Sequence, residues 1–128
     1  MRKLALIISL FLSVNLFAEP FQGRPTWTKV SCPSKNHEDI YEFLMFFVKY
    51  FEGDIGYNDG HKFNAYITLP SDNCYEAIHI LNVEIYDGSF IYNLEQSLQF
   101  GEDFEACASE VREQVKGLET ILQNIEKM

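Results

Sequence analysis

The Asp87-Gly88 pair constrains the fold of this chain more than any other feature. An Asp-Gly pair between two alternating stretches is the strongest short-range signal for a β-hairpin with a two-residue turn. The turn places Tyr86 opposite Ser89 and predicts a hairpin over residues 76–100. The pairs on one face are then apolar: Ile85 with Phe90, Val83 with Tyr92, and Leu81 with Leu94. The pairs on the other face are mostly polar: Glu84 with Ile91, Asn82 with Asn93, and Ile80 with Glu95. This pattern predicts an antiparallel sheet with one buried face.

Two further segments have the alternation of strands. Residues 62–69 alternate polar and apolar side chains up to Pro70, which indicates a half-buried strand. Residues 26–30 alternate over a shorter length and favour an additional short strand. Residues 54–61 are polar and rich in turn formers, so we expect a loop there. A competing interpretation makes residues 72–81 a helix capped by Ser71, because short apolar runs are ambiguous.

Two segments have helical periodicity. Residues 36–51 are apolar almost all round, and Asn36 with Asp39 matches a shortened capping box. Residues 102–127 form one apolar stripe with acidic residues in the first turn. Gly117 in this stripe suggests a close approach between helix and sheet. We therefore expect an α+β fold of order β-α-β-β-β-α, with an antiparallel three- or four-stranded sheet and two helices packed on one face.

The N-terminal segment predicts export. Arg2 and Lys3 precede a short apolar run that ends at Ala18, which is typical of a secretory signal peptide. An uncleaved membrane anchor is the alternative, although the run is too short for a comfortable membrane span. We expect residues 1–18 to be the signal peptide, residues 19–128 to form one small domain, and the mature protein to be periplasmic or secreted, without membrane insertion.

The charge excludes some partners and favours others. The chain has 19 acidic against 10 basic residues and a formal charge of -9. A nucleic-acid binder needs a basic face, so we expect no nucleic-acid partner. An acidic exported domain instead favours a basic protein partner.

The three cysteines predict one disulfide in an exported protein. The hairpin register places Cys74 near the start of the last helix, which favours the pair Cys74–Cys107. Cys32 then has a free thiol. It can form an intermolecular disulfide or react, or it can be a small buried hydrophobic residue. In the remaining alternative, Cys32 is itself the disulfide partner of Cys74 or Cys107.

Specific catalytic or cofactor motifs are missing from the sequence. Cys32 and His37 have no local signature of a nucleophile and its base. Residues 54–60 contain calcium-type ligands, but Asp59 stands where an EF-hand requires glycine. We therefore predict no catalytic residue, no metal, no cofactor and no enzymatic activity.

These features favour a protein-binding module. The most specific hypothesis is an inhibitor or immunity protein that occludes a basic secreted or cell-wall-acting enzyme. Its predicted partner-binding residues are Asp54, Tyr57, Asp59 and Asp87. Tyrosines at 57, 66, 75, 86 and 92, with Trp27, are of the type that anchors interfaces. The alternatives are a structural or accessory subunit of a cell-envelope assembly, including a possible homodimer, and a small-molecule carrier.

Overall fold

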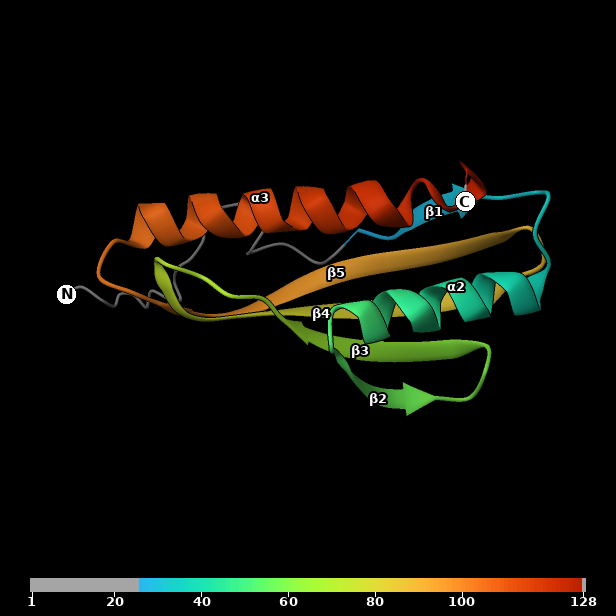
Figure 1. Ribbon diagram of the computed structural model, residues 1–128, viewed down its shortest axis with the longest axis horizontal. Coiled ribbons are helices and arrows are strands. Elements are labelled where there is room, and N and C mark those ends of the chain that lie inside the picture. Colours follow the sequence, from blue (N-terminus) through green and yellow to red (C-terminus); the bar gives the residue numbers. More distant parts are fainter. Residues whose placement is uncertain (1–25, 128) are drawn as a thin grey trace.

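A five-stranded antiparallel sheet is the centre of the computed structural model, which describes residues 26–127. The predicted signal peptide, residues 1–18, lies outside the described residues. The strand order across the sheet is β1-β5-β4-β3-β2 (Figure 1). The strands are β1 (Thr28–Ser31), β2 (Asp54–Asn58), β3 (Lys62–Thr68), β4 (Cys74–Tyr86) and β5 (Ser89–Phe100). The fold is therefore α+β with an antiparallel sheet.

The hairpin of β4 and β5 has the register that the Asp-Gly turn indicates. Tyr86 pairs with Ser89, and the same register continues to Glu76 and Gln99. An irregularity between Cys74 and Glu76 then places Cys74 opposite Phe100. Gly88 has a φ of +80°, which a residue with a side chain adopts only with strain. Residues 74–81 belong to β4, so the helical alternative for residues 72–81 is wrong.

Strand β2 corrects the expected fold. Residues 54–61 were expected to form a loop, but residues 54–58 pair with β3 at the edge of the sheet. All five residues of β2 are exposed, so this strand has no alternation of buried and exposed side chains. Backbone pairing with β3 forms it, with an irregular register between Ile55 and Asn58. The sheet therefore has five strands, rather than three or four.

Helix α2 (His37–Tyr50) begins where its capping residues predict. The Asn36 side chain accepts a hydrogen bond from the Asp39 backbone N–H at 2.8 Å, and Asp39 accepts one from the Asn36 N–H at 3.4 Å. These bonds satisfy backbone donors that the first helical turn leaves unpaired.

Helix α3 (Phe104–Leu122) is shorter than expected. Asp103 caps its first turn by accepting a hydrogen bond from the Ala106 N–H at 3.0 Å. After Leu122 the chain turns and continues as the short 3₁₀ helix η2 (Ile125–Lys127). The Asn124 side chain donates to the Thr120 carbonyl, and such side-chain bonds compete with continued helical pairing. No described helix is both long and apolar enough to cross a membrane.

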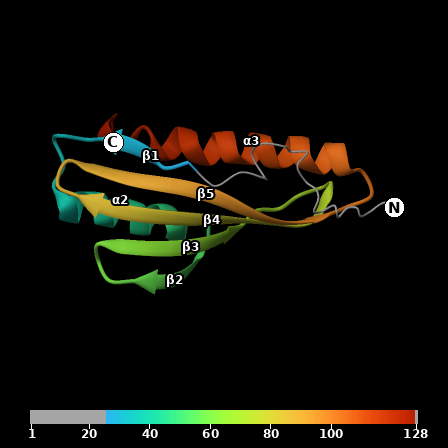
Figure 2. The same cartoon turned by 180° about the vertical axis from the view of Figure 1, so that it is seen from behind.

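Both helices lie on the same side of the sheet (Figures 1 and 2). The larger core cluster joins α2 and the end of α3 to the inward side chains of the strands, including Leu44, Val83 and Leu118. Tyr92 ties α3 to the sheet, because its hydroxyl donates to Glu119 at 3.1 Å and accepts from Gln123 at 2.7 Å. Burial of this phenol raises the pKa of Tyr92 to about 12.

The disulfide joins Cys74 of β4 to Cys107 of α3, the pairing that the hairpin register favours. A second, smaller core cluster surrounds it and includes Ala77 and Val111. The disulfide therefore ties the open end of the hairpin to the first turns of α3.

We expect loss of this disulfide to lower the free energy of unfolding. Its sequence separation of 33 residues corresponds to about 3–4 kcal/mol in the chain-entropy account. Urea unfolding of the Cys74→Ala/Cys107→Ala variant should show this loss and become insensitive to reducing agent. A variant as stable as the unsubstituted protein would contradict the expected contribution.

Gly117 does not mark a close helix–sheet approach, contrary to the expectation. It is exposed on α3, and a Cβ atom there would meet no atom within 4 Å. Gly101 differs, because a Cβ atom there would lie 2.5 Å from the Asn73 carbonyl oxygen.

We predict opposite effects of alanine at these two glycines. Gly117→Ala should raise the free energy of unfolding by about 1 kcal/mol, since it removes backbone freedom from an exposed helix interior. Gly101→Ala should lower it, because the backbone of residue 73 must move. Urea unfolding of both variants measures the difference, and a destabilising Gly117→Ala would refute the open environment of that residue.

Candidate binding cleft on the open sheet face

The sheet face that points away from the helices carries a shallow cleft. Figure 2 shows this face, with the strands in front of α2. The cleft has a volume of about 760 Å³, and its side chains come from all parts of the sheet. The polar and aromatic residues that line it are Trp27, Tyr57, Lys62, Asn64, Asn82, Glu84, Asn93 and Glu95. Within residues 26–127, no helix covers this face, so no helix blocks the cleft from a ligand.

Three asparagines form a row across the floor of the cleft. Asn64 of β3 pairs with Asn82 of β4, which pairs with Asn93 of β5. The Asn82 side-chain N–H donates to the Asn93 side-chain oxygen at 2.9 Å. The Asn64 side-chain oxygen accepts from the Tyr57 backbone N–H at 2.8 Å. Direct pairing across three strands thus places three amide side chains side by side on one face.

Within residues 26–127, Asn93 has a side-chain hydrogen-bond donor without an acceptor. The residue is buried, with 4% of its surface exposed, yet it lines the cleft. Its oxygen accepts from Asn82, whereas its Nδ2 donates to no acceptor among residues 26–127. A buried donor without an acceptor costs about 1–3 kcal/mol. A ligand that offers an acceptor at this point would remove that cost.

An aromatic side chain stands at each end of the asparagine row. Trp27 directly precedes β1, whose Thr28 pairs with Tyr92, and this register brings Trp27 beside Asn93. Tyr57 of β2 lies beyond Asn64 at the other end. The two side chains are 45% and 57% exposed. Exposed rings beside hydrogen-bonding groups are typical of interface anchors.

The charged groups of the cleft leave one carboxylate without an ion pair. Glu84 lies 3.8 Å from Lys62 and accepts a hydrogen bond from the Tyr86 hydroxyl at 2.7 Å. The bond to Glu84 raises the pKa of Tyr86. Glu95 accepts only a long hydrogen bond from Asn82, at 3.4 Å, and forms no ion pair within the described chain. Glu95 is therefore a negative charge available to a cationic ligand.

Of the four predicted partner-binding residues, Tyr57 alone lines the cleft. Asp54 is exposed at the start of β2. The Asp87 side chain accepts a hydrogen bond from the His37 backbone N–H at 2.9 Å and so joins the hairpin turn to the start of α2. Asp59 closes the β2–β3 turn by accepting from the backbone N–H groups of His61 and Lys62. The carboxylates of Asp59 and Asp87 thus accept backbone hydrogen bonds at two turns of the fold.

Several cleft residues were not predicted as site residues. The hairpin register already paired Asn82 with Asn93, and the alternation of residues 62–69 placed Asn64 on the same face. A row of amides on three adjacent strands was thus a detectable signal. Among the tyrosines considered as anchors, Tyr92 is buried under α3 and is not part of a surface.

The free thiol of Cys32 is fully buried in the larger core cluster. Burial raises the pKa of this thiol, and the nearby Glu126 raises it further. The structure therefore places Cys32 as a small hydrophobic residue rather than as a thiol accessible to a second chain.

Polar residues in the β2–β3 turn bind backbone groups rather than forming a cation site. The Asn58 side chain accepts from the Gly60 N–H at 2.9 Å, and Asp59 accepts from two further N–H groups. Within residues 26–127, no group of three His, Cys, Asp or Glu side chains is arranged to hold a metal ion.

We expect Asp59 to make the stability of the β2–β3 turn depend on pH. The backbone N–H of Lys62, then that of His61 and the Tyr57 hydroxyl, lower the pKa of Asp59 to about 2. A lowered pKa means that the turn is fully stabilised above about pH 4 and loses this stabilisation as the pH falls towards 2. NMR titration of the Asp59 carboxyl carbon should show a midpoint near 2, and Tyr57→Phe should raise it. A midpoint near 4 in the unsubstituted protein would contradict these hydrogen bonds.

The fold and the cleft define a small α+β domain that covers one face of an antiparallel sheet with helices and leaves a cleft on the other. Such a fold is also found in a crystal structure of a DUF4468 family protein from Bacteroides ovatus ATCC 8483. The two structures are similar with a TM-score of 0.51, over 81% of this chain and 86% of the other, at 11% sequence identity. At this identity the similarity shows the fold alone. No protein-family model and no curated protein matches the chain.

Proposed function

We propose that this protein is an exported, non-enzymatic binding module that holds a basic protein partner in the cleft on the open sheet face. The concrete form of the proposal is an inhibitor or immunity protein that occludes a secreted or cell-wall-acting enzyme. The observation that carries it is buried Asn93, whose Nδ2 has no acceptor within residues 26–127, in a cleft with an exposed ring at each end. The disulfide supports export, because such bonds persist outside the reducing cytosol.

The cleft suits an extended segment of a partner protein. Asparagine side chains both donate and accept hydrogen bonds, so a row of them can pair with successive peptide groups. The Asn93 Nδ2 would donate to a partner carbonyl, and Trp27 and Tyr57 would pack against apolar side chains on either side. Such a segment would lie across the strands, along the row that Asn64, Asn82 and Asn93 form.

Charge gives the preference for a basic segment. Within residues 26–127, Glu95 is the cleft carboxylate without an ion pair, so it could pair with a Lys or Arg of the partner. The excess of 19 acidic over 10 basic residues would also attract a basic protein from a distance and increase the association rate. Added salt screens exposed charges, so it should weaken both the Glu95 ion pair and the long-range attraction.

The test is capture of the partner by the exported protein and by cleft variants. Trp27→Ala should weaken binding of the captured partner at least about tenfold, as expected for loss of an interface anchor. Glu95→Gln should weaken it about threefold and reduce its salt dependence, since an exposed ion pair contributes little more. The captured enzyme should lose activity when the unsubstituted protein is added.

Glu113→Gln is the matched control, because Glu113 lies on α3 with 73% of its side chain exposed. It removes the same charge on the other side of the sheet and should leave affinity unchanged. A partner bound equally by Trp27→Ala and the unsubstituted protein would refute the cleft as the binding site. Capture of envelope proteins that the cleft variants still bind would instead favour the structural subunit.

A further inference from the structure

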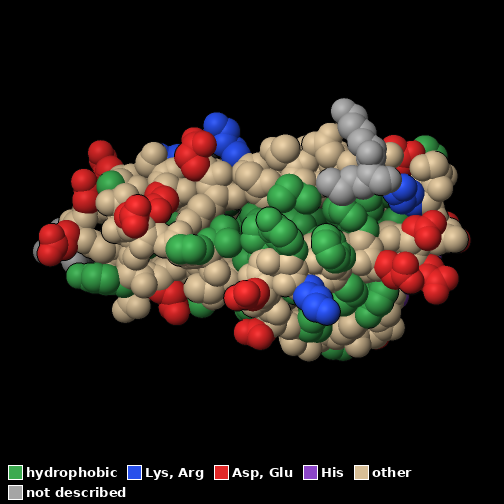
Figure 3. Space-filling model, in the orientation of Figure 1, with side chains coloured by type: hydrophobic (Ala, Val, Ile, Leu, Met, Phe, Trp, Pro, Cys, Tyr) green, Lys and Arg blue, Asp and Glu red, His purple; other side chains and the backbone are tan. Residues whose placement is uncertain are grey.

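Helix α2 presents an apolar stripe to solvent on the side of the molecule opposite the cleft. Phe46 is 65% exposed and Tyr50 is 69% exposed, and their rings are in contact. Figure 3 views this side and shows hydrophobic side chains gathered over α2 and beside it. A phenylalanine and a tyrosine adjacent on one helix face form the kind of exposed patch that marks an interaction site.

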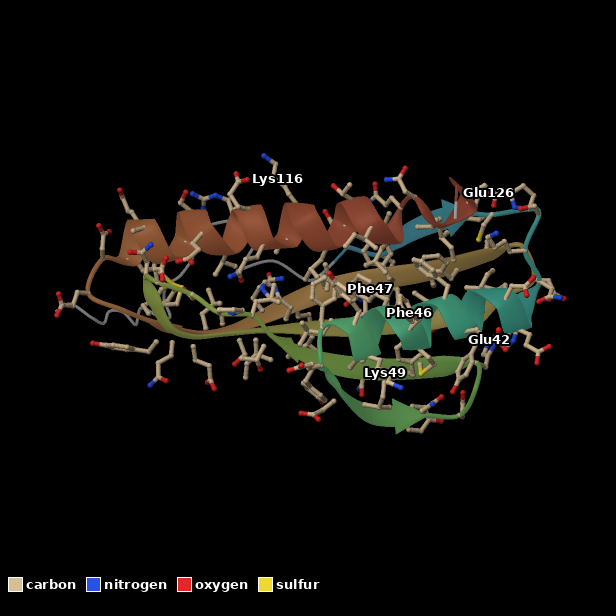
Figure 4. The ribbon with its side chains drawn as sticks, in the orientation of Figure 1. Glu42, Phe46, Phe47, Lys49, Lys116 and Glu126 are labelled. Atoms are coloured by element: carbon tan, nitrogen blue, oxygen red, sulfur yellow. A yellow bond between two sulfur atoms is a disulfide. The ribbon has the colours of Figure 1, made fainter. Side chains whose placement is uncertain are left out.

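Opposite charges flank this patch along the helix. Glu42 lies one turn before Phe46, and Lys49 lies one turn after it (Figure 4). Lys49 is the one Lys or Arg residue of α2. Neither residue takes part in an ion pair within residues 26–127. The stripe is thus locally neutral in a protein whose formal charge is -9, where most surfaces would repel a second copy.

We propose that the surface of α2 formed by Glu42, Met45, Phe46 and Lys49 is a homodimer interface. In this interface, α2 packs antiparallel against α2 of a second copy. The charge arrangement carries this proposal. A two-fold axis that crosses the helix between Met45 and Phe46 leaves Glu42 and Lys49 about 5 Å from the axis along the helix, in opposite directions. Each Glu42 then faces the Lys49 of the second copy, and symmetry forms this pair twice.

The same axis brings the apolar residues together at the centre. Met45 of each copy would pack against Phe46 of the other, because these residues lie on either side of the axis. Phe46 would then lose most of its exposed surface, which gives the hydrophobic part of the association. A single helix pair covers less area than the 1,200–2,000 Å² or so of a stable standard interface, so the dimer is expected to be weak and reversible.

Sedimentation equilibrium of the exported chain tests the dimer, with loading concentrations up to about 500 µM because the affinity is modest. The unsubstituted protein should associate reversibly into dimers. Phe46→Asp should abolish association. Glu42→Lys and Lys49→Glu should each weaken it at least about tenfold, because each places like charges opposite one another at both symmetric positions. The double variant Glu42→Lys/Lys49→Glu should restore association to within about threefold, since it only exchanges the partners of each pair.

Two controls distinguish loss of this interface from a general effect of added charge and from loss of the fold. Tyr75→Asp changes a similarly exposed aromatic residue on β4, away from α2, and should leave association unchanged. Circular dichroism and thermal unfolding of each variant verify the fold. A monomer at all concentrations, a dimer that survives Phe46→Asp, or a double variant as weak as the single ones would overturn the proposal. Retention of partner binding by Phe46→Asp distinguishes this surface from the cleft.

Discussion

The pairing of β4 with β5 is the interaction on which the rest of the structure depends. The hairpin turn forms three hydrogen bonds with the chain between β1 and the start of α2: the Asp87 side chain accepts from the His37 N–H, the Gly88 carbonyl accepts from the Cys32 N–H, and the Gly88 N–H donates to the Lys35 carbonyl. At its other end, the same hairpin brings Cys74 to Cys107 of α3. A shift of one residue in this register would move the core side chains to solvent and separate all of these contacts.

The register also determines which residues lie on each of the two faces of the sheet. On one face the inward side chains of β4 and β5, such as Val83 and Tyr92, pack under the helices. On the other face the intervening residues, Asn82 and Asn93, form the floor of the cleft. Because the side chains of a strand alternate, the residues that bury the core and the residues that line the cleft are fixed in position relative to each other. A dimer through α2 would use the helical side and leave the cleft free for a partner.

The candidate site was only partly predictable, for reasons that differ between residues. The hairpin pattern alone places Asn82 opposite Asn93, and the alternation of β3 places Asn64 on the same face. Asp59 and Asp87 were expected to bind a partner because they are acidic and lie in turns. Their carboxylates accept backbone N–H groups at 2.7–2.9 Å, and no sequence pattern distinguishes such carboxylates from unpaired ones. Local hydrogen bonding in a turn is a property of the folded backbone.

The sequence alone determined the elements whose signals are local: the hairpin turn, the capping box of α2, the periodicity of α3 and the alternation of β3. These depend on neighbouring residues and on the fixed periods of helices and strands. Only the tertiary structure decided the fifth strand, since β2 has five exposed residues and exists through its backbone pairing with β3. It also decided the solvent-facing position of Gly117, the burial of Cys32 and the meeting of Trp27, Asn93 and Tyr57 in one cleft. Each of these results from contacts between residues far apart in the chain, which no local pattern records.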